Sequence, residues 1–216
     1  TDVASSGLGT CAVTDVGATY CWGSDLFGQV GDGNDDQGDE FEPVLVSGLD
    51  GSAASVLEVA NSAVHACALL DTGAVRCWGD GNGGVLGNGS TASVVQHSPV
   101  PVVGIDGVQA RAVRIAVGES HSCALLDTGA VRCWGYDADG QVGDGSTNNM
   151  PHALPTNVLG LDGSGPLAID LSAGEQHACA LLESGQLRCW GDNTSGQLGH
   201  ASANTRESAP VVVSGI

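Results

Sequence analysis

The chain has 216 residues, with 25 acidic side chains, six arginines and no lysine, so its formal net charge at pH 7 is −19. This excess of negative charge disfavours binding to nucleic-acid phosphates and to anionic lipids. Thirty-four glycines and short apolar runs, none near the 18 residues that a membrane span needs, predict a turn-rich all-β protein with no membrane span and no nucleic-acid partner.

Two series of cysteines run along the chain in identical steps of 56 residues. The first members stand at Cys11, Cys67, Cys123 and Cys179, and the second at Cys21, Cys77, Cys133 and Cys189. Each second cysteine is followed by Trp-Gly, and a Gly-x-x-Gly turn recurs in phase after it. A period of this length is typical of propellers and solenoids rather than of a single-core domain.

Each copy contains the same predicted elements in chain order, and the second copy shows them well. An apolar run at Val56–Ala60 precedes two runs, His65–Leu70 and Ala74–Gly79, that flank a tight turn. A polar loop, the Gly-x-x-Gly turn and a valine-rich run that begins near Pro101 follow. Four strands per unit result, and we expect one repeat domain with units at approximately 1–56, 57–112, 113–168 and 169–216.

The tight turn predicts how the cysteines pair. If Asp71-Thr72-Gly73 is a three-residue hairpin loop with Gly73 in the left-handed conformation, Cys67 lies directly opposite Cys77. Opposed residues on antiparallel strands are close enough for a disulfide. The same register predicts three further bonds, namely Cys11–Cys21, Cys123–Cys133 and Cys179–Cys189.

A metal site is the alternative use of these cysteines. Zinc-binding pairs are usually separated by two to four residues, whereas nine residues stand between these, so we expect disulfides and no metal or cofactor. Disulfides persist in secreted and periplasmic proteins. The chain is therefore predicted to be extracellular or on the cell surface, with the periplasm as an alternative.

The third unit carries a long run that resembles a known repeat. The stretch Gly118–Gly135, which reads Gly-x-x-His-Ser-Cys-Ala-Leu-Leu-x-x-Gly-x-Val-x-Cys-Trp-Gly, is followed by Gly140-Gln-Val-Gly-Asp-Gly. It resembles the regulator of chromosome condensation repeat family, and its cysteine-containing form resembles secreted bacterial members. The resemblance implies a β-propeller-type array of four-stranded antiparallel blades, usually about seven in a ring. Because only four units are present, we expect an open arc, or part of a larger ring or assembly.

Residues that repeat in phase are assigned to the fold. They are the histidines at 65, 121 and 177, the tryptophans at 22, 78, 134 and 190, and the arginines at 76, 132 and 188. No nucleophile or acid is phased with the histidines, so we expect no catalytic residues and no enzyme activity.

The acidic segment Asp32–Glu40 raises the question of calcium. It departs from the calcium-loop pattern twice, because Gln37 stands where glycine is needed and Pro43 where the closing glutamate belongs. A solvated acidic loop is the favoured interpretation.

Function in a repeat scaffold is expected where the copies differ. The loops after Trp-Gly differ most at eight predicted partner-binding positions: Asp25, Leu26, Phe27, Asn82, Tyr136, Asp137, Asp139 and Asn193. Phe27 and Tyr136 are the aromatic anchors among them. The alternative is that these loops vary because loops tolerate change.

These observations favour a non-enzymatic extracellular scaffold for protein binding or for structural assembly, as in a fibre or surface layer. Its partners would be proteins, including further copies of itself joined through open blade ends. Resemblance to secreted propellers that block β-lactamases makes an enzyme inhibitor the alternative. Guanine nucleotide exchange, the role of nuclear family members, is opposed by the cysteines, the acidity and the missing blades.

Overall fold

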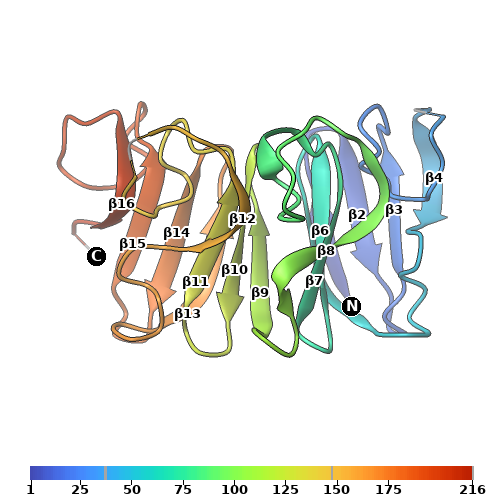
Figure 1. The fold of residues 1–216 in the computed structure, drawn as a ribbon, viewed down its shortest axis with the longest axis horizontal. Coiled ribbons are helices and arrows are strands. Elements are labelled where there is room, and N and C mark those ends of the chain that lie inside the picture. The colour runs from blue at the N-terminus through green and yellow to red at the C-terminus, as the bar shows by residue number, and fades with distance from the viewer. Residues whose placement is uncertain (37, 147, 216) are drawn as a thin grey trace.

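The computed structural model describes residues 1–36, 38–146 and 148–215. It consists of four separate sheets, each with four antiparallel strands, placed side by side in an arc (Figure 1). Within every sheet the strands follow chain order, so each connection is a hairpin between neighbours. The predicted all-β array of four blades is confirmed.

The blades contain strands of four to eleven residues. The first consists of β1 (Asp2–Ser5), β2 (Gly9–Val13), β3 (Thr19–Gly23) and β4 (Glu40–Leu45), and the second of β5 (Val56–Asn61), β6 (His65–Leu70), β7 (Ala74–Gly79) and β8 (Gln96–Asp106). The third consists of β9 (Ala112–Val117), β10 (His121–Leu126), β11 (Val131–Gly135) and β12 (His152–Asn157), and the fourth of β13 (Ala168–Ala173), β14 (His177–Leu182), β15 (Leu187–Asp192) and β16 (Arg206–Val212). A short 3-10 turn, η1 (Asn82–Gly84), follows β7.

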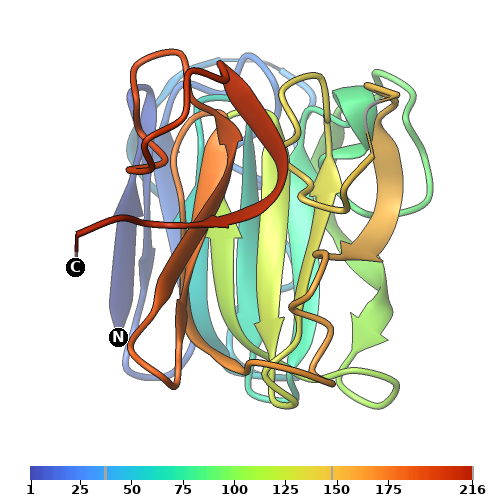
Figure 2. The same ribbon diagram turned by 90° about the vertical axis from the view of Figure 1, so that its left-hand side faces the viewer.

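The first strand of each blade lies on the inner side of the arc. Strands β1, β5, β9 and β13 contact one another in succession, while the fourth strands form the outer edges. Prolines such as Pro43 and Pro155 lie within these outer strands, where a missing N–H breaks no ladder. The first and last blades stand at opposite ends of the array (Figures 1 and 2). None of the described residues belongs to a helix long and apolar enough to cross a bilayer.

The hairpin register places all four predicted cysteine pairs opposite each other. In the third blade the Leu126 N–H donates to the Ala130 carbonyl at 2.8 Å, so hydrogen-bonded and non-hydrogen-bonded pairs alternate from this pair onwards. Cys123 and Cys133 lie three pairs away from this one, on the side remote from the turn, and therefore occupy a closely spaced non-hydrogen-bonded pair. The Cα atoms of the four cysteine pairs are 4.0 to 4.1 Å apart, and each pair is at disulfide distance.

A tryptophan joins each blade to the one before it. The Trp78 indole N–H donates to the Gln29 carbonyl at 2.9 Å, and all three inter-blade tryptophans are fully buried. Trp134 and Trp190 make the same bond to Val85 and Gln141, at 2.8 and 3.0 Å. The predicted packing role is confirmed for these three.

In the first three blades, the glycine that closes the Gly-x-x-Gly turn makes room for the indole ring of the following blade. At Gly31 and Gly143 the backbone has a positive φ of 78° and 74°. A Cβ there would lie 2.5 to 2.6 Å from an indole ring of the following blade. Trp22 comes before this series, and its side chain is only partly buried.

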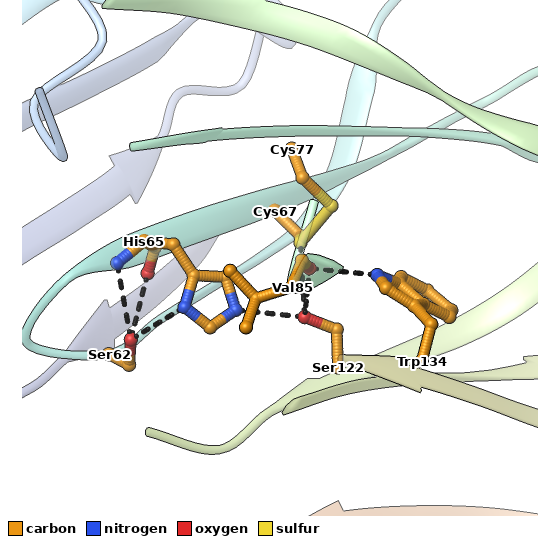
Figure 3. Close-up of a disulfide and its surroundings, with 7 residues drawn as sticks. All are labelled: Ser62, His65, Cys67, Cys77, Val85, Ser122 and Trp134. Carbon is orange, nitrogen blue, oxygen red and sulfur yellow. Dashed lines mark hydrogen bonds between the residues drawn. A yellow bond between two sulfur atoms is a disulfide. The ribbon is translucent and has the colours of Figure 1, made fainter. Parts of the chain in front are cut away.

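A second buried contact joins the second and third blades (Figure 3). The Ser122 hydroxyl donates to the Val85 carbonyl at 3.1 Å, so it accepts the Nε2–H of His65 at 2.8 Å. The other ring nitrogen of His65 then accepts from the Ser62 hydroxyl at 3.0 Å. The neutral form of this histidine is thereby fully hydrogen-bonded inside the protein.

His121 occupies the same position in the third blade without such partners. Both of its ring nitrogens are buried, and neither has a hydrogen-bond partner among the residues that the structure describes. Ala178 stands where the second interface has Ser122. Burial lowers the pKa of His65 to about 3 and that of His121 to about 4, since the charged imidazolium would lose its hydration.

A comparison of two glycines in equivalent turns separates the contribution of blade-to-blade packing to the free energy of unfolding from that of backbone strain. Gly140 and Gly196 both have positive φ, but a Cβ at Gly140 would lie 2.6 Å from the Ser208 backbone of the next blade, and one at Gly196 would meet nothing within 4 Å. We expect Gly196→Ala to lower the free energy of unfolding by about 1 kcal/mol. Gly140→Ala should lower it by about 2–4 kcal/mol. Equal losses of unfolding free energy in the two variants, measured by urea titration, would show that the close approach of Gly140 to Ser208 does not contribute to stability.

The buried histidines predict a loss of stability in mild acid. Their folded-state pKa values lie below the ordinary value of 6.5, so the unfolded chain binds more protons between those limits. Stability is fully present above pH 6.5 and falls towards pH 4 by about 1.4 kcal/mol per pH unit for each histidine. His121→Gln should make the dependence shallower in urea titrations between pH 7 and 5. An unchanged slope would show that His121 is not buried in neutral form.

Candidate functional site

Two adjoining cavities lie where the loops after β7, β11 and β15 meet the turns between the first and second strands. The first has a volume of about 360 Å³ and is lined by Val64, Asp80, Asn82, Val85, Glu119, Ser120, Tyr136 and Gln176. The second has about 390 Å³ and is lined by Asp139, Glu175, Gln176, His177, Asp192, Thr194 and Gln197. Gln176 belongs to both. We call the pair the acidic groove, because Asp80, Glu119, Asp139, Glu175 and Asp192 line it without any arginine.

The groove is built across three blades. The N–H of Glu119 donates to the carbonyl of Glu175 at 2.9 Å, which holds the turns of the third and fourth blades side by side. Both glutamate side chains remain exposed, and Tyr136 forms a wall with 46% of its surface accessible. The groove therefore presents several carboxylates around one exposed aromatic ring.

Asp192 is held in its charged form at the edge of this groove. Desolvation by burial would raise its pKa, but hydrogen bonds from Thr194 and Gln197 outweigh it and keep the pKa below the ordinary value. The Thr194 N–H and hydroxyl each donate to this carboxylate at 3.0 Å. The negative charge at this position therefore persists into mild acid.

The structure divides the eight predicted partner-binding positions. Asn82, Tyr136 and Asp139 line the acidic groove, and their role in binding a partner stays a prediction. Leu26 is exposed and Phe27 is partly buried, and both lie in the first blade outside the cavities. The two predicted aromatic anchors are therefore not brought to one site.

The prediction is wrong for Asp25, Asp137 and Asn193, whose side chains are buried. Each accepts a backbone N–H five residues ahead in its own loop, from Val30 at 2.8 Å, Val142 at 2.9 Å and Leu198 at 3.2 Å. They hold the loop in shape and are not available to a partner. The sequence did carry a signal, because aspartate and asparagine share the side-chain oxygen that this bond needs.

Burial also changes the acidity of the two aspartates. Desolvation raises the pKa of Asp25 above its ordinary value, against the hydrogen bond from Val30 that lowers it. Desolvation likewise raises the pKa of Asp137, and the negative charge of the neighbouring Asp144 adds to the effect. Both carboxylates sit where a negative charge is poorly solvated.

Four of the groove acids were missed by reasoning from the sequence alone, namely Asp80, Glu119, Glu175 and Asp192. Glu119 and Glu175 follow a glycine at equivalent positions of two copies. Because they repeat, they look like part of the fold. Only the approach of neighbouring blades brings these separate carboxylates to one surface.

The acidic segment at 32–40 has no assembled cation site among its described residues. Asp32 accepts the N–H of Asn34 at 2.9 Å and its side-chain amide at 2.6 Å, so its carboxylate stabilises its own turn. Gln37, on which the calcium comparison depends, lies outside the described residues. The solvated-loop interpretation stays a prediction.

Comparison with protein families identifies the repeat. The family model described as regulator of chromosome condensation (RCC1) repeat matches residues 17–69, 72–125 and 128–181, and a second model of the same description matches 112–141 and 168–197. Together they cover well over half of the chain.

Two relatives share the repeat over most of the chain. Human E3 ubiquitin-protein ligase HERC2 is 32% identical over 94% of this chain and 4% of its own length. The ultraviolet-B receptor UVR8 of Arabidopsis thaliana is 33% identical over 82% of this chain and 38% of its own length. The chain thus spans less than half the length of these relatives.

Solved structures with the same fold include human WBSCR16, with a TM-score of 0.84 and 25% identity over 99% of this chain and 53% of that one. Yeast RCC1 (Prp20), in its complex with Kap60, has a TM-score of 0.79 and 25% identity over 97% of this chain and 48% of that one. With four matching blades and the repeat model on most of its length, the chain belongs to the regulator of chromosome condensation (RCC1) repeat family.

Proposed function

We propose that this chain is a non-enzymatic protein-binding scaffold whose acidic groove takes a lysine- or arginine-rich segment of a partner protein. The observation that carries the proposal is the convergence of five carboxylates and the exposed Tyr136 on two adjoining cavities. A cationic side chain in such a groove gains from the surrounding negative charge and from contact with an aromatic face.

The charge of the whole chain supports this choice of partner. A net charge of −19 attracts cationic segments from a distance and repels anionic ones. The yeast relative Prp20p is described with binding properties to Gsp1p and histones, which is a precedent for protein partners on this scaffold. Exposed tyrosines are also favoured anchors at protein interfaces.

We further propose that the chain works in an oxidising compartment outside the cytosol. All eight cysteines lie in pairs at disulfide distance, and none is free among the described residues. Disulfides of this number are rare where thioredoxin and glutathione keep thiols reduced.

A charge-matched pair of variants tests the groove. Glu119→Gln with Glu175→Gln should weaken binding of a fluorescent oligoarginine peptide about 10-fold at low salt, because each lost carboxylate removes a favourable contact with a cation. Asp71→Asn with Glu183→Gln changes the net charge equally at exposed hairpin turns, remote from the groove, and should leave binding nearly unchanged. Equal weakening by the two double variants, measured by anisotropy, would show that only overall charge attracts the peptide.

Self-association through the free blade faces is a second candidate function. Three tryptophans fill a socket on the preceding blade, whereas Trp22 is partly buried and the equivalent loop at Gln197–Gly199 receives no tryptophan from the described residues. We propose that Trp22 of a second copy would donate to the backbone carbonyl of Gln197, as the other three tryptophans donate to the equivalent carbonyls. Such a head-to-tail contact produces rings or filaments.

Light scattering over a range of protein concentrations tests this association. The weight-average mass of the wild-type chain should rise with concentration, since the two faces are complementary. Trp22→Gln should remain monomeric under the same conditions because the indole that fills the socket is absent. A constant monomer mass for the wild type would rule out the association.

A further inference from the structure

A cluster of three metal-ligating side chains lies within the third blade, outside the acidic groove. It consists of Asp137 in the loop after β11, Asp144 in the following turn and His152 at the start of β12, and their ligand atoms all lie within 4.8 Å of one another. Nε2 of His152 is 3.5 Å from an oxygen of Asp144 and 3.8 Å from one of Asp137. These distances are too long for hydrogen bonds.

The surroundings of His152 determine which ring nitrogen carries its proton. The Thr156 hydroxyl donates to the Leu154 carbonyl at 3.1 Å, so its oxygen accepts from Nδ1–H of His152 at 3.2 Å. In the neutral imidazole this leaves a lone pair on Nε2. That nitrogen is buried and has no hydrogen-bond partner in the described part of the chain. A lone pair that faces two carboxylates is repelled by them, and a metal ion between the three groups would remove this repulsion.

The spacing of the three groups suits a metal ion. A zinc ion binds nitrogen and carboxylate oxygen at about 2.0–2.2 Å, and tetrahedral or slightly wider angles then separate its ligand atoms by about 3.4–3.8 Å. The two separations from His152 fall within that interval. We propose that Asp137, Asp144 and His152 bind a divalent transition metal of the zinc class, although the sequence alone predicts no metal in this chain.

The choice of metal follows from the donor set. Imidazole nitrogen together with carboxylate oxygen suits zinc and its neighbours, whereas calcium and magnesium prefer oxygen alone. Hydrogen bonds from neighbouring groups also orient two of the ligands. Thr156 fixes the tautomer of His152, and the Val142 N–H holds one oxygen of Asp137 at 2.9 Å, leaving the other towards the cluster. Ser146 donates to that second oxygen at 3.3 Å.

The second and fourth blades show that this combination is not required by the fold. The outer-strand residues that pair with the Trp-Gly glycine are Glu40, Gln96, His152 and Glu207 in the four blades. In the second blade the equivalent set is Gly81, Asn88 and Gln96, which carries no charge. In the fourth, His200 bonds directly to Glu207 at 3.0 Å, so its imidazole already has a partner.

Occupancy would affect the acidic groove indirectly. The metal would tie the start of the outer strand β12 to the loop after β11, and that loop carries Tyr136 and Asp139 into the groove. The metal is therefore a clamp on the loop rather than a catalytic centre. The proposal stands on the cluster itself and does not depend on what the groove binds.

Titration calorimetry on protein first treated with a chelator tests the site. Wild-type protein should bind one Zn²⁺ per chain near neutral pH. His152→Gln and Asp144→Asn install the residues that the second blade carries at these positions, so they are compatible with the fold, and each should weaken binding at least about 10-fold. At 100 times the dissociation constant, Zn²⁺ should raise the wild-type Tm by about 5 °C or more and the variants' Tm much less.

A matched control removes an imidazole from the equivalent region of the fourth blade. His200→Gln in the fourth blade should leave the affinity for Zn²⁺ unchanged, and Ca²⁺ should produce no comparable rise in Tm. Three results would overturn the proposal: no stoichiometric binding of Zn²⁺, equal affinity in wild type and His152→Gln, or an Nε2 of His152 that remains protonated in nitrogen-detected NMR of the Zn²⁺-saturated protein.

Discussion

The hydrogen bond from a tryptophan indole to a backbone carbonyl of the preceding blade sets the geometry on which the rest of the structure depends. It requires a glycine with positive φ in the receiving turn, because any Cβ there would strike the ring. It also requires that turn to have one shape, which buried aspartates such as Asp25 and Asp137 maintain from within the loop. The spacing of the blades and the position of the loops thus follow from one contact, repeated three times.

Cysteine pairs constrain the individual blades, whereas non-covalent contacts hold neighbouring blades together. Each cysteine pair lies within one hairpin, so it stabilises a blade without joining it to a neighbour. The joints between blades depend on tryptophan, glycine and the His65–Ser122 contact. The family matches reflect this arrangement, since the segment 72–125 takes two strands from one blade and two from the next. The repeat in the sequence therefore contains the interface between blades as well as the blade itself.

The sequence differences between the four copies can be interpreted once equivalent positions of the blades are compared. Equivalent outer-strand positions hold a neutral set in the second blade, a directly bonded His200–Glu207 pair in the fourth, and three separated ligands in the third. The acidic groove is likewise confined to the ends of the second, third and fourth blades. A uniform scaffold thus carries two local features. One is the acidic groove, and the other is the cluster of Asp137, Asp144 and His152 next to a loop that lines the groove.

The sequence by itself determined the repeat, the four strands per unit, the hairpin register and the cysteine pairs such as Cys67–Cys77, because all of these depend on residues close together in the chain. It did not determine which loop residues reach solvent. Asp137 and Asp139 stand two positions apart, yet one is buried and the other lines a cavity. Tertiary structure alone decided this, as it decided the meeting of Glu119 with Glu175 and of Asp137 with His152. The physical reason is that burial and proximity there come from neighbouring blades and from strand pairing, which local sequence does not specify.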